Sequence, residues 1–471
     1  MSWALVTANG RPSLLDHILR SVPRRYRLPP LPDAASPESI ANTATALAIA
    51  IEQARIALAG GKKPDPLVKR HFVDALARLI DAAMRTDSGD PAFQAMVLRH
   101  QAATVREYAS LSAHADSDRR QLHAAVNAIA HPAKLQQLAP GPQRDALAQV
   151  HNLATTAAWS ALSEAVQGHA LMPETEHDSQ LQQGLQRLLG SPALERLQRL
   201  QALSCDQLVL QYQSLWDSNG PRPGSAAAAA QGSASQKRGA TGEALATQAI
   251  EALARRLNEA ESDHASYRVV TSLLVPPSIP ASAERAKSEW DVVLLRQPAA
   301  ADAQDGWDAC LLVEAKASVD AASTDLPRLL RGVRLLAHAQ QDESYAFESR
   351  QGTVHLCGGA LKILSTDEAE LARTVLYCCA ADAEASTRLL GAASRMQLLS
   401  AAASLDYASA LKSGRAANAA GLATVWDELL ESPQWRPVLN QYPMLRQARE
   451  LMVNPADLLA TIERSFDPTD A

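Results

Sequence analysis

The first half of the chain carries apolar residues at the spacing of one helix face. Runs such as "DPLVKRHFVDALARLIDAAMR" and "DPAFQAMVLRHQAATVREYASL" place apolar side chains at i, i+3, i+4 and i+7. Another run opens at Ser36, a residue type suited to an N-cap, and closes at Gly60. No fixed repeat period is evident, so the pattern predicts a helical bundle or array over residues 1–216 rather than a solenoid.

The helical pattern breaks between residues 217 and 238. The segment "DSNGPRPGSAAAAAQGSASQKR" consists mainly of Gly, Pro, Ser and Ala, with almost no large apolar side chain. Segments of this composition behave as flexible linkers. We therefore predict a flexible linker over 217–238 and a domain boundary within it.

Beyond the linker, short apolar runs alternate with helical ones. The predicted elements are a helix over 241–260, strands over 267–276, 289–295 and 309–317, a helix over 325–341, a short strand over 353–359 and a strand over 373–380. A strand–helix–strand crossover implies a parallel pair of strands, so this order predicts a mixed sheet covered by helices. The predicted architecture is multidomain, α plus α/β. It has a helical domain (1–216), the linker, an α/β domain (239–383) and a C-terminal helical segment (384–471).

Charge and cysteine content narrow the classes of function. The net charge is −6, so any nucleic-acid surface must be a local basic patch. The five cysteines form no CxxC pair, which argues against a disulfide framework or a zinc site and fits a reducing cytoplasm. No apolar run approaches the ~20 residues that span a bilayer, and no GxxxxGK[ST] or GxSxG motif occurs. We expect a cytoplasmic protein. We do not expect a membrane protein, an NTPase or a serine hydrolase.

Two predicted strands carry charged side chains among apolar ones. "EWDVVLL" contains Asp291, and "CLLVEAKAS" contains Glu314 and Lys316, which share one face of a strand because they are two residues apart. An acid and an amine in such a place are costly unless they are paired or bind a metal. A hairpin would bring the carboxylate of Asp291 beside that of Glu314, and a divalent cation would relieve their repulsion. We therefore expect Mg²⁺ or Mn²⁺, with one of its waters as the nucleophile.

The rarity of lysine relative to arginine in this chain draws attention to Lys316. The chain contains nine lysines and thirty-six arginines. A lysine provides a compact ammonium group whose pKa responds to its surroundings. We expect Lys316 to orient or deprotonate the attacking water, or to neutralise charge that develops on a phosphate.

These residues resemble the PD-(D/E)xK nuclease superfamily over about residues 235–385. Asp291 followed by Glu314-Ala315-Lys316 is similar to its signature, and Trp290 stands where the family name has proline. Gly239, Gly242 and Glu243 resemble the Gly-x-x-Gly-Glu opening of the first core helix in several branches of the superfamily.

The resemblance implies a restriction-endonuclease-like α/β core that hydrolyses phosphodiester bonds, and we expect the substrate to be DNA. It implies that Asp291, Glu314 and the carbonyl of Ala315 bind the metal. Glu243 would be a further acid near the metal, and Lys316 the catalytic lysine.

Seven basic residues are candidates for nucleic-acid contacts. Three arginines lie three apart on the predicted second core helix, two residues precede the first core helix, whose N-terminus would favour anions, and two lie in the loop 276–288. They are Arg328, Arg331 and Arg334; Lys237 and Arg238; and Arg285 and Lys287.

Simpler interpretations remain open for each feature. Asp291, Glu314 and Lys316 could form a structural ion pair at a sheet edge or belong to an inactive nuclease-like fold. Glu243 could be a solvated glutamate at a helix start. The arginines could form a solvated helix face.

The sequence thus predicts a bacterial deoxyribonuclease of restriction, defence or repair, whose helical domain binds a protein partner or self-associates. The alternatives are a non-enzymatic interaction or scaffold protein, an effector toxin, or an RNA nuclease on the same fold.

Overall fold

The computed structural model describes residues 14–28, 31, 42–172, 179–221, 225–298, 306–382 and 388–465. The chain divides into two compact units. The α/β unit comprises residues 1–79, 224–401 and 419–471, and the helical unit comprises residues 80–223 and 402–418. Within the described ranges, no helix combines the length and the apolar character that crossing a bilayer requires.

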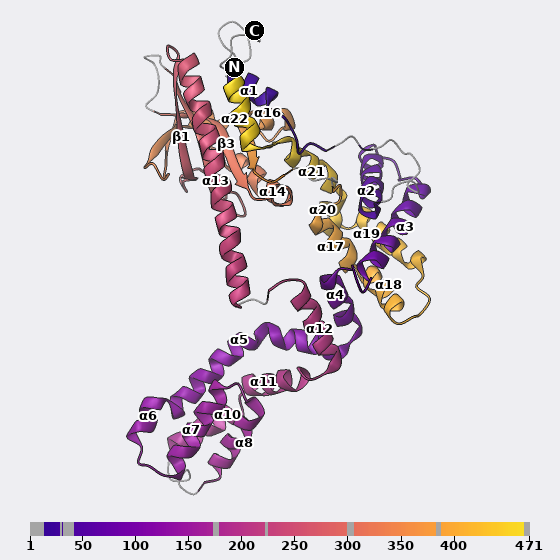
Figure 1. The fold of residues 1–471 in the computed structure, drawn as a ribbon, viewed down its shortest axis with the longest axis vertical. Coiled ribbons are helices and arrows are strands. Elements are labelled where there is room, and N and C mark those ends of the chain that lie inside the picture. Colours follow the sequence, from indigo (N-terminus) through magenta and orange to yellow (C-terminus); the bar gives the residue numbers. More distant parts are fainter. Residues whose placement is uncertain are drawn as a thin grey trace. The chain divides into compact units, whose positions relative to one another are not determined.

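A five-stranded mixed sheet is the centre of the α/β unit (Figure 1). Its strands, in spatial order, are β1 (Ala265–Leu274), β2 (Glu289–Pro298), β3 (Asp308–Lys316), β6 (Val375–Cys379) and β7 (Met452–Val453). The first three are antiparallel neighbours, whereas β6 runs parallel to β3, and β7 parallel to β6. The predicted mixed sheet is confirmed, and its last strand comes from the C-terminal segment that we expected to be helical.

Both faces of the sheet are covered, as the strand sequences require. Along β2, Val292 and Leu294 belong to one hydrophobic cluster, while Val293 and Leu295 belong to the other. This alternation follows from the two-residue period of a strand. A near-continuous apolar run such as "VVLL" therefore indicates a strand that is buried on both sides.

Two helices of the predicted core cover the two faces. Helix α13 (Ala226–Ala260) packs on the face of Val292 through apolar residues in its second half, together with α1 (Leu14–Ser21) and α22 (Pro455–Arg464). Helix α14 (Val319–Leu336) packs on the opposite face, where Ser318 caps it by accepting the N–H of Ala321 at 3.3 Å. That cap explains why α14 begins earlier than the predicted residue 325.

The predicted short strand over 353–359 exists, but it does not join the main sheet. It forms a separate two-stranded hairpin, in which β5 (Val354–Cys357) pairs with β4 (Ser344–Phe347). The large apolar residues of the hairpin pack into the cluster on the α14 side of the sheet.

The structure corrects the flexible linker predicted over 217–238. Residues 217 and 218 end helix α12 (Gln207–Ser218), and residues from 226 onward belong to the 35-residue helix α13. Ser225 caps α13 by accepting the N–H of Ala228 at 3.1 Å. Alanine has the highest helix propensity, and a segment without a packing face can be helical when it extends a docked helix.

The division into domains also differs from the expected contiguous blocks. The boundary near residue 224 lies inside the predicted linker, but residues 1–79 belong to the α/β unit and 402–418 to the helical unit. The reason is packing between distant segments. Phe72 and Trp426 have ring centroids 5.2 Å apart, and Lys69 forms an ion pair with Asp427 at 2.6 Å.

The remaining helices complete the two units. The helical unit contains α4 (Pro91–Gln101), α5 (Ala103–Ala130), α6 (Pro132–Gln137), α7 (Pro142–Thr155), α8 (Trp159–Ala170), α10 (Ser179–Leu189), α11 (Pro192–Leu203), α12 and α18 (Ala402–Lys412). Helix α3 (Pro66–Ala83) begins in the α/β unit and ends in the helical unit. The α/β unit further contains α2 (Thr43–Ala59), α15 (Gly358–Lys362), α16 (Glu368–Thr374), α17 (Ala392–Ser400), η2 (Ala419–Leu422), α19 (Ala423–Glu431), η3 (Pro433–Trp435), α20 (Arg436–Leu439) and α21 (Gln441–Glu450).

Candidate active site on strands β2 and β3

Strands β2 and β3 bring two of the predicted acids together. In their antiparallel register Val292 lies opposite Val313, so Asp291 and Glu314 are the next residues along each strand. The Oδ2 atom of Asp291 accepts a hydrogen bond from the backbone N–H of Ala315 at 2.8 Å. This bond fixes the carboxylate of Asp291 at the end of β3, beside Glu314.

The carboxylate of Glu314 lies between two ammonium groups. Its Oε1 atom accepts a hydrogen bond from Lys316 Nζ at 2.7 Å, and its Oε2 atom forms an ion pair with Lys287 Nζ. Glu314 is only 4% exposed. Burial raises the pKa of Glu314 above its usual value, although the charges of both lysines act in the opposite direction and that of Asp291 raises it further. The two lysines are the compensation that a buried carboxylate requires.

Lys316 has two carboxylate partners. Besides Glu314, the Oδ2 atom of Asp325 on α14 lies 3.2 Å from Lys316 Nζ. Burial by itself lowers the pKa of Lys316, but the two carboxylates outweigh it and raise that pKa above its usual value. In this arrangement Lys316 is charged, so it is suited to stabilise negative charge on a phosphate rather than to deprotonate water.

Asp325 and Tyr377 belong to this cluster although the sequence did not single them out. The hydroxyl of Tyr377 donates to Asp325 Oδ2 at 3.3 Å, and Tyr377 pairs with Glu314 in the parallel register of β3 and β6. Burial raises the pKa of Tyr377 far above its usual value, so its hydroxyl stays a donor. One signal was present, because a tyrosine within the apolar run "RTVLYCCA" needs a buried polar partner.

The structure corrects the prediction that Lys287 contacts nucleic acid. Its side chain is buried against Glu314, and its Nζ atom lies 5.5 Å from the ring centroid of Trp290. Its backbone N–H donates to the carbonyl of Arg328 at 3.3 Å. Gly332 permits this approach, because a Cβ atom there would lie 2.7 Å from that of Lys287. The loop 276–288 is therefore seated on α14 and directs Lys287 inward.

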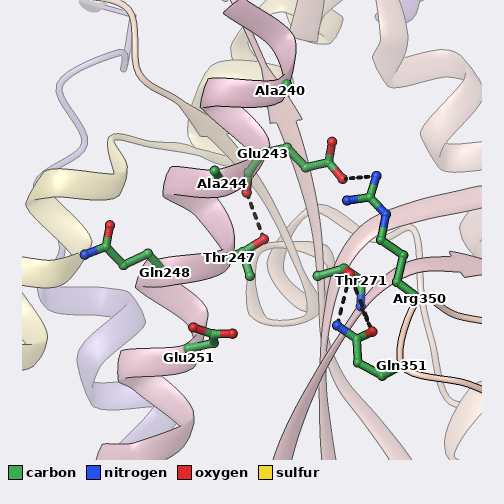
Figure 2. A pocket seen from close by; sticks show the side chains of 9 residues that line it. All are labelled: Ala240, Glu243, Ala244, Thr247, Gln248, Glu251, Thr271, Arg350 and Gln351. Atoms are coloured by element: carbon green, nitrogen blue, oxygen red, sulfur yellow. Dashed lines mark hydrogen bonds and ion pairs between the residues drawn. The ribbon is translucent and has the colours of Figure 1, made fainter. Parts of the chain in front are cut away.

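Glu243, which the resemblance implies to be an acid near the metal, lines a pocket beside Arg350. It projects from α13 towards Arg350, with its Oε1 atom 3.3 Å from Arg350 Nη2 (Figure 2). The pocket has a volume of about 380 Å³ and is lined by Ala240, Glu243, Ala244, Thr247, Gln248, Glu251, Thr271, Arg350 and Gln351. As far as the described residues go, this lining includes none of Asp291, Glu314 and Lys316. In this structure the side chain of Glu243 forms an ion pair with Arg350.

The other basic candidates divide into two groups. On α14, Arg328 and Arg334 are exposed, and the Nε atom of the partly exposed Arg331 donates to the carbonyl of Arg285 at 2.8 Å. This contact joins α14 to the loop that carries Arg285, whose side chain is 82% exposed. The exposed Arg285 and the partly exposed Arg331 thus meet where the loop contacts α14.

Lys237 and Arg238 are exposed, but they do not stand at a helix N-terminus. Helix α13 begins at Ala226, so both residues lie inside it. We predicted that a helix N-terminus would favour anions near Lys237 and Arg238. This prediction is wrong, because the effect of the helix dipole is confined to the first turn.

The donor set of the cluster suits a hard divalent cation in part. Asp291 and Glu314 offer carboxylate oxygens, the ligands that Mg²⁺ and Mn²⁺ prefer, and Mg²⁺ keeps several waters when two carboxylates bind it. Within the described part of the chain, no group of three or more His, Cys, Asp or Glu residues is arranged to hold a metal. Both oxygens of Glu314 also face ammonium groups. A cation at Glu314 would have to replace one of these two ammonium groups.

Comparison with known proteins yields no match to a family model, to a curated protein or to a solved structure.

Proposed function

We propose that this protein is a metal-dependent nuclease that hydrolyses phosphodiester bonds in DNA, on a restriction-endonuclease-like core. One observation carries the proposal. Asp291 and Glu314, together with Lys316, meet at the neighbouring ends of β2 and β3. The order of helix, three strands, helix and strand agrees with the resemblance to the PD-(D/E)xK superfamily.

Each side chain of the cluster has a role in this proposal. Asp291 and Glu314 hold the cation, which supplies Lewis-acid stabilisation and an activated water when bound. The charged Lys316 stabilises negative charge that develops on the phosphate. Asp325 holds the Lys316 ammonium from the side of α14, and Tyr377 holds Asp325 in turn.

The exposed arginines of α14 supply a substrate face. Arg328 and Arg334 lie on the helix that also carries Asp325, and Arg331 connects this helix to Arg285. Contacts of arginine with phosphates position a nucleic acid without reading its sequence. This arrangement supports a role in restriction, defence or repair, where the backbone of DNA must be held against the site.

Cleavage assays test the proposal. The full chain would be incubated with linear, circular and single-stranded DNA and with RNA, in Mg²⁺, in Mn²⁺ or in EDTA. We expect cleavage of DNA with either cation and none in EDTA. Lys316→Met should reduce the rate about a hundredfold or more, because it removes the charge that faces the phosphate.

Lys362→Met is the matched control, since Lys362 is an exposed lysine on α15. Cleavage that persists in EDTA, or that Lys316→Met leaves unchanged, would contradict the metal mechanism. Cleavage confined to RNA would assign the same site to an RNA nuclease.

A second candidate is a non-enzymatic scaffold protein, favoured by the full neutralisation of Glu314 by two ammonium groups. A buried ion cluster of this kind can specify packing without chemistry. In that case no substrate is cleaved under any condition, and Lys316→Met changes only the free energy of unfolding.

A further inference from the structure

The ammonium group of Lys287 forms an ion pair with the Oε2 atom of Glu314, one of the proposed ligands of the cation. We propose that Lys287 is an internal counter-ion that competes with the divalent cation for Glu314, so that the metal binds only when this ammonium moves away. This inference rests on the proposed cation site. It gives a regulatory role to Lys287, which is not part of the Asp291, Glu314 and Lys316 signature. It predicts that Lys287 raises the metal concentration at which the site fills.

Each carboxylate oxygen of Glu314 already faces an ammonium group. Lys316 holds Oε1 and Lys287 holds Oε2, and the side chains of Lys287 and Glu314 are 4% and 5% exposed. Water therefore does not screen this pair as it screens a surface ion pair. A cation that binds Glu314 must replace one of the two ammonium groups.

Lys287 is the ammonium that can be replaced. Lys316 has Asp325 as a second carboxylate partner, which retains it when Glu314 changes partner. Within the described part of the chain, the ammonium of Lys287 lies against Glu314 and the ring of Trp290. With a cation on Glu314, Lys316 would keep Asp325 as a counter-charge, whereas Lys287 would have no other described carboxylate partner, so Lys287 is the ammonium that must move away.

The charges of the cluster agree with this competition. Asp291, Glu314 and Asp325 contribute three negative charges, and Lys287 and Lys316 contribute two positive charges. The remaining single negative charge is too little for a divalent cation. When the ammonium of Lys287 departs, two negative charges remain, and a divalent cation neutralises them. A buried site favours the arrangement in which its charges cancel.

The loop allows the side chain to move while its backbone stays. The N–H of Lys287 donates to the carbonyl of Arg328, and the neighbouring Ser288 accepts the N–H of Val275 at 2.9 Å. Gly332 lies directly against the backbone of Lys287. The backbone is thus held on both sides, and the flexible four-carbon stem of the lysine is the part that can swing.

Direct binding of Mn²⁺ in the absence of nucleic acid tests the proposal. Isothermal titration calorimetry would compare the wild-type chain with Lys287→Met and with Lys287→Arg, which keeps the charge. The Lys287→Met variant should bind Mn²⁺ with a dissociation constant about tenfold lower or more, because a unit charge next to the site is removed. The Lys287→Arg variant should bind like the wild type.

Arg285→Met is the matched control, since it removes one positive charge from the same loop at an exposed position. It should leave the affinity for Mn²⁺ unchanged. An affinity of Lys287→Met equal to or weaker than that of the wild type would overturn the proposal. So would the absence of Mn²⁺ binding in both proteins at millimolar concentration.

A second measurement uses the unmodified chain and does not depend on the folding of a variant. Acetylation by an amine-reactive reagent, followed by mass spectrometry, reports which lysines are accessible. Mn²⁺ should increase the labelling of Lys287, with the exposed Lys362 as the internal reference. Unchanged labelling of Lys287 at saturating Mn²⁺ would overturn the proposal.

Failure of this inference and failure of the proposed function give different results. Tighter binding of Mn²⁺ by Lys287→Met, with no nucleic acid cleaved by the wild type, supports the counter-ion role and removes the nuclease. Cleavage that requires Lys316, with equal affinities of Lys287→Met and the wild type, supports the nuclease and overturns the counter-ion role.

Discussion

The carboxylate of Asp291 accepts a hydrogen bond from the backbone N–H of Ala315 at 2.8 Å, which joins the start of β2 to the end of β3. This bond leaves one carboxylate oxygen of Asp291 for a further ligand. It also brings the acid next to Glu314, the preceding residue on β3. The same side chain therefore supports the sheet and shapes the proposed cation site, and substitutions can separate these two roles.

Asp291→Asn should separate the support of the sheet from the binding of the cation. The amide oxygen can still accept the N–H of Ala315, while the negative charge is lost. We expect the affinity for Mn²⁺ to fall about tenfold or more, since a carboxylate at the site is neutralised. The free energy of unfolding should change by less than in Asp291→Ala. That variant loses the hydrogen bond, which should lower its free energy of unfolding by about 1 kcal/mol. Calorimetry and urea unfolding measure the two quantities. Equal destabilisation by both variants would show that the charge, not the hydrogen bond, supports the sheet.

Asp325→Asn tests whether Asp325 positions Lys316. The carboxylates of Glu314 and Asp325 together raise the pKa of Lys316 against the opposing effect of burial. Removing one of these charges should lower that pKa, so the alkaline limb of the cleavage rate should move to lower pH. The rate as a function of pH measures this shift. Asp320→Asn on the same helix is the control, since the Asp320 side chain is 44% exposed. A limb that stays in place in Asp325→Asn would assign Asp325 a structural role alone.

The cysteines should differ sharply in reactivity. All five lie in the described part of the chain, and Cys205 is exposed. Burial raises the pKa of Cys310 and Cys378 to about 12 and that of Cys357 to about 11. Because the thiolate is the nucleophile, a pKa of 12 leaves roughly one molecule in ten thousand reactive at pH 8.

Titration of the folded chain with a thiol reagent at pH 8 should therefore show one fast thiol, and Cys205→Ser should remove it. Denaturant should make the remaining thiols react. Any fast thiol that remains in the native Cys205→Ser variant would contradict the burial of these side chains.

Phe72→Ala tests the grouping of the N-terminal helices with the C-terminal ones. The ring of Phe72 is fully buried and packs against Trp426, far along the chain. Truncating it should reduce the free energy of unfolding of this unit by about 3–5 kcal/mol. Leu67→Ala is the control, since Leu67 on the same helix is 52% exposed and its truncation should cost less than about 0.5 kcal/mol. Thermal and urea unfolding measure both. A small effect of Phe72→Ala would contradict the packing of α3 on α19.

Local patterns predicted most of the elements around the site. The apolar runs at 289–295 and 309–317 became β2 and β3, because a short, near-continuous apolar run with β-branched residues is typical of a strand that is buried on both faces. The same is true of β6 and of the second half of α13. The short strand β7 carried no such signal, since two residues are too few for a period, and its pairing with β6 depends on how the C-terminal segment folds back.

The linker was mispredicted for a related reason. A lack of large apolar residues in 226–238 correctly indicated that this segment has no buried face, since its side chains are exposed. It did not indicate the absence of a helix. Alanine forms helices through backbone propensity alone, and the second half of α13, docked on the sheet, provides the nucleus from which the helix extends.

The amino-acid sequence by itself determined that Glu314 and Lys316 share one face of a strand and that Asp291 lies in the preceding apolar strand along the chain, because strand geometry follows from the local order of residues. Only the tertiary structure decided that Lys287 and Asp325 complete the cluster and that Glu243 pairs with Arg350. These partners come from elements separated along the chain. Which charges meet depends on how a loop and two helices pack on the sheet, and no local period encodes that packing.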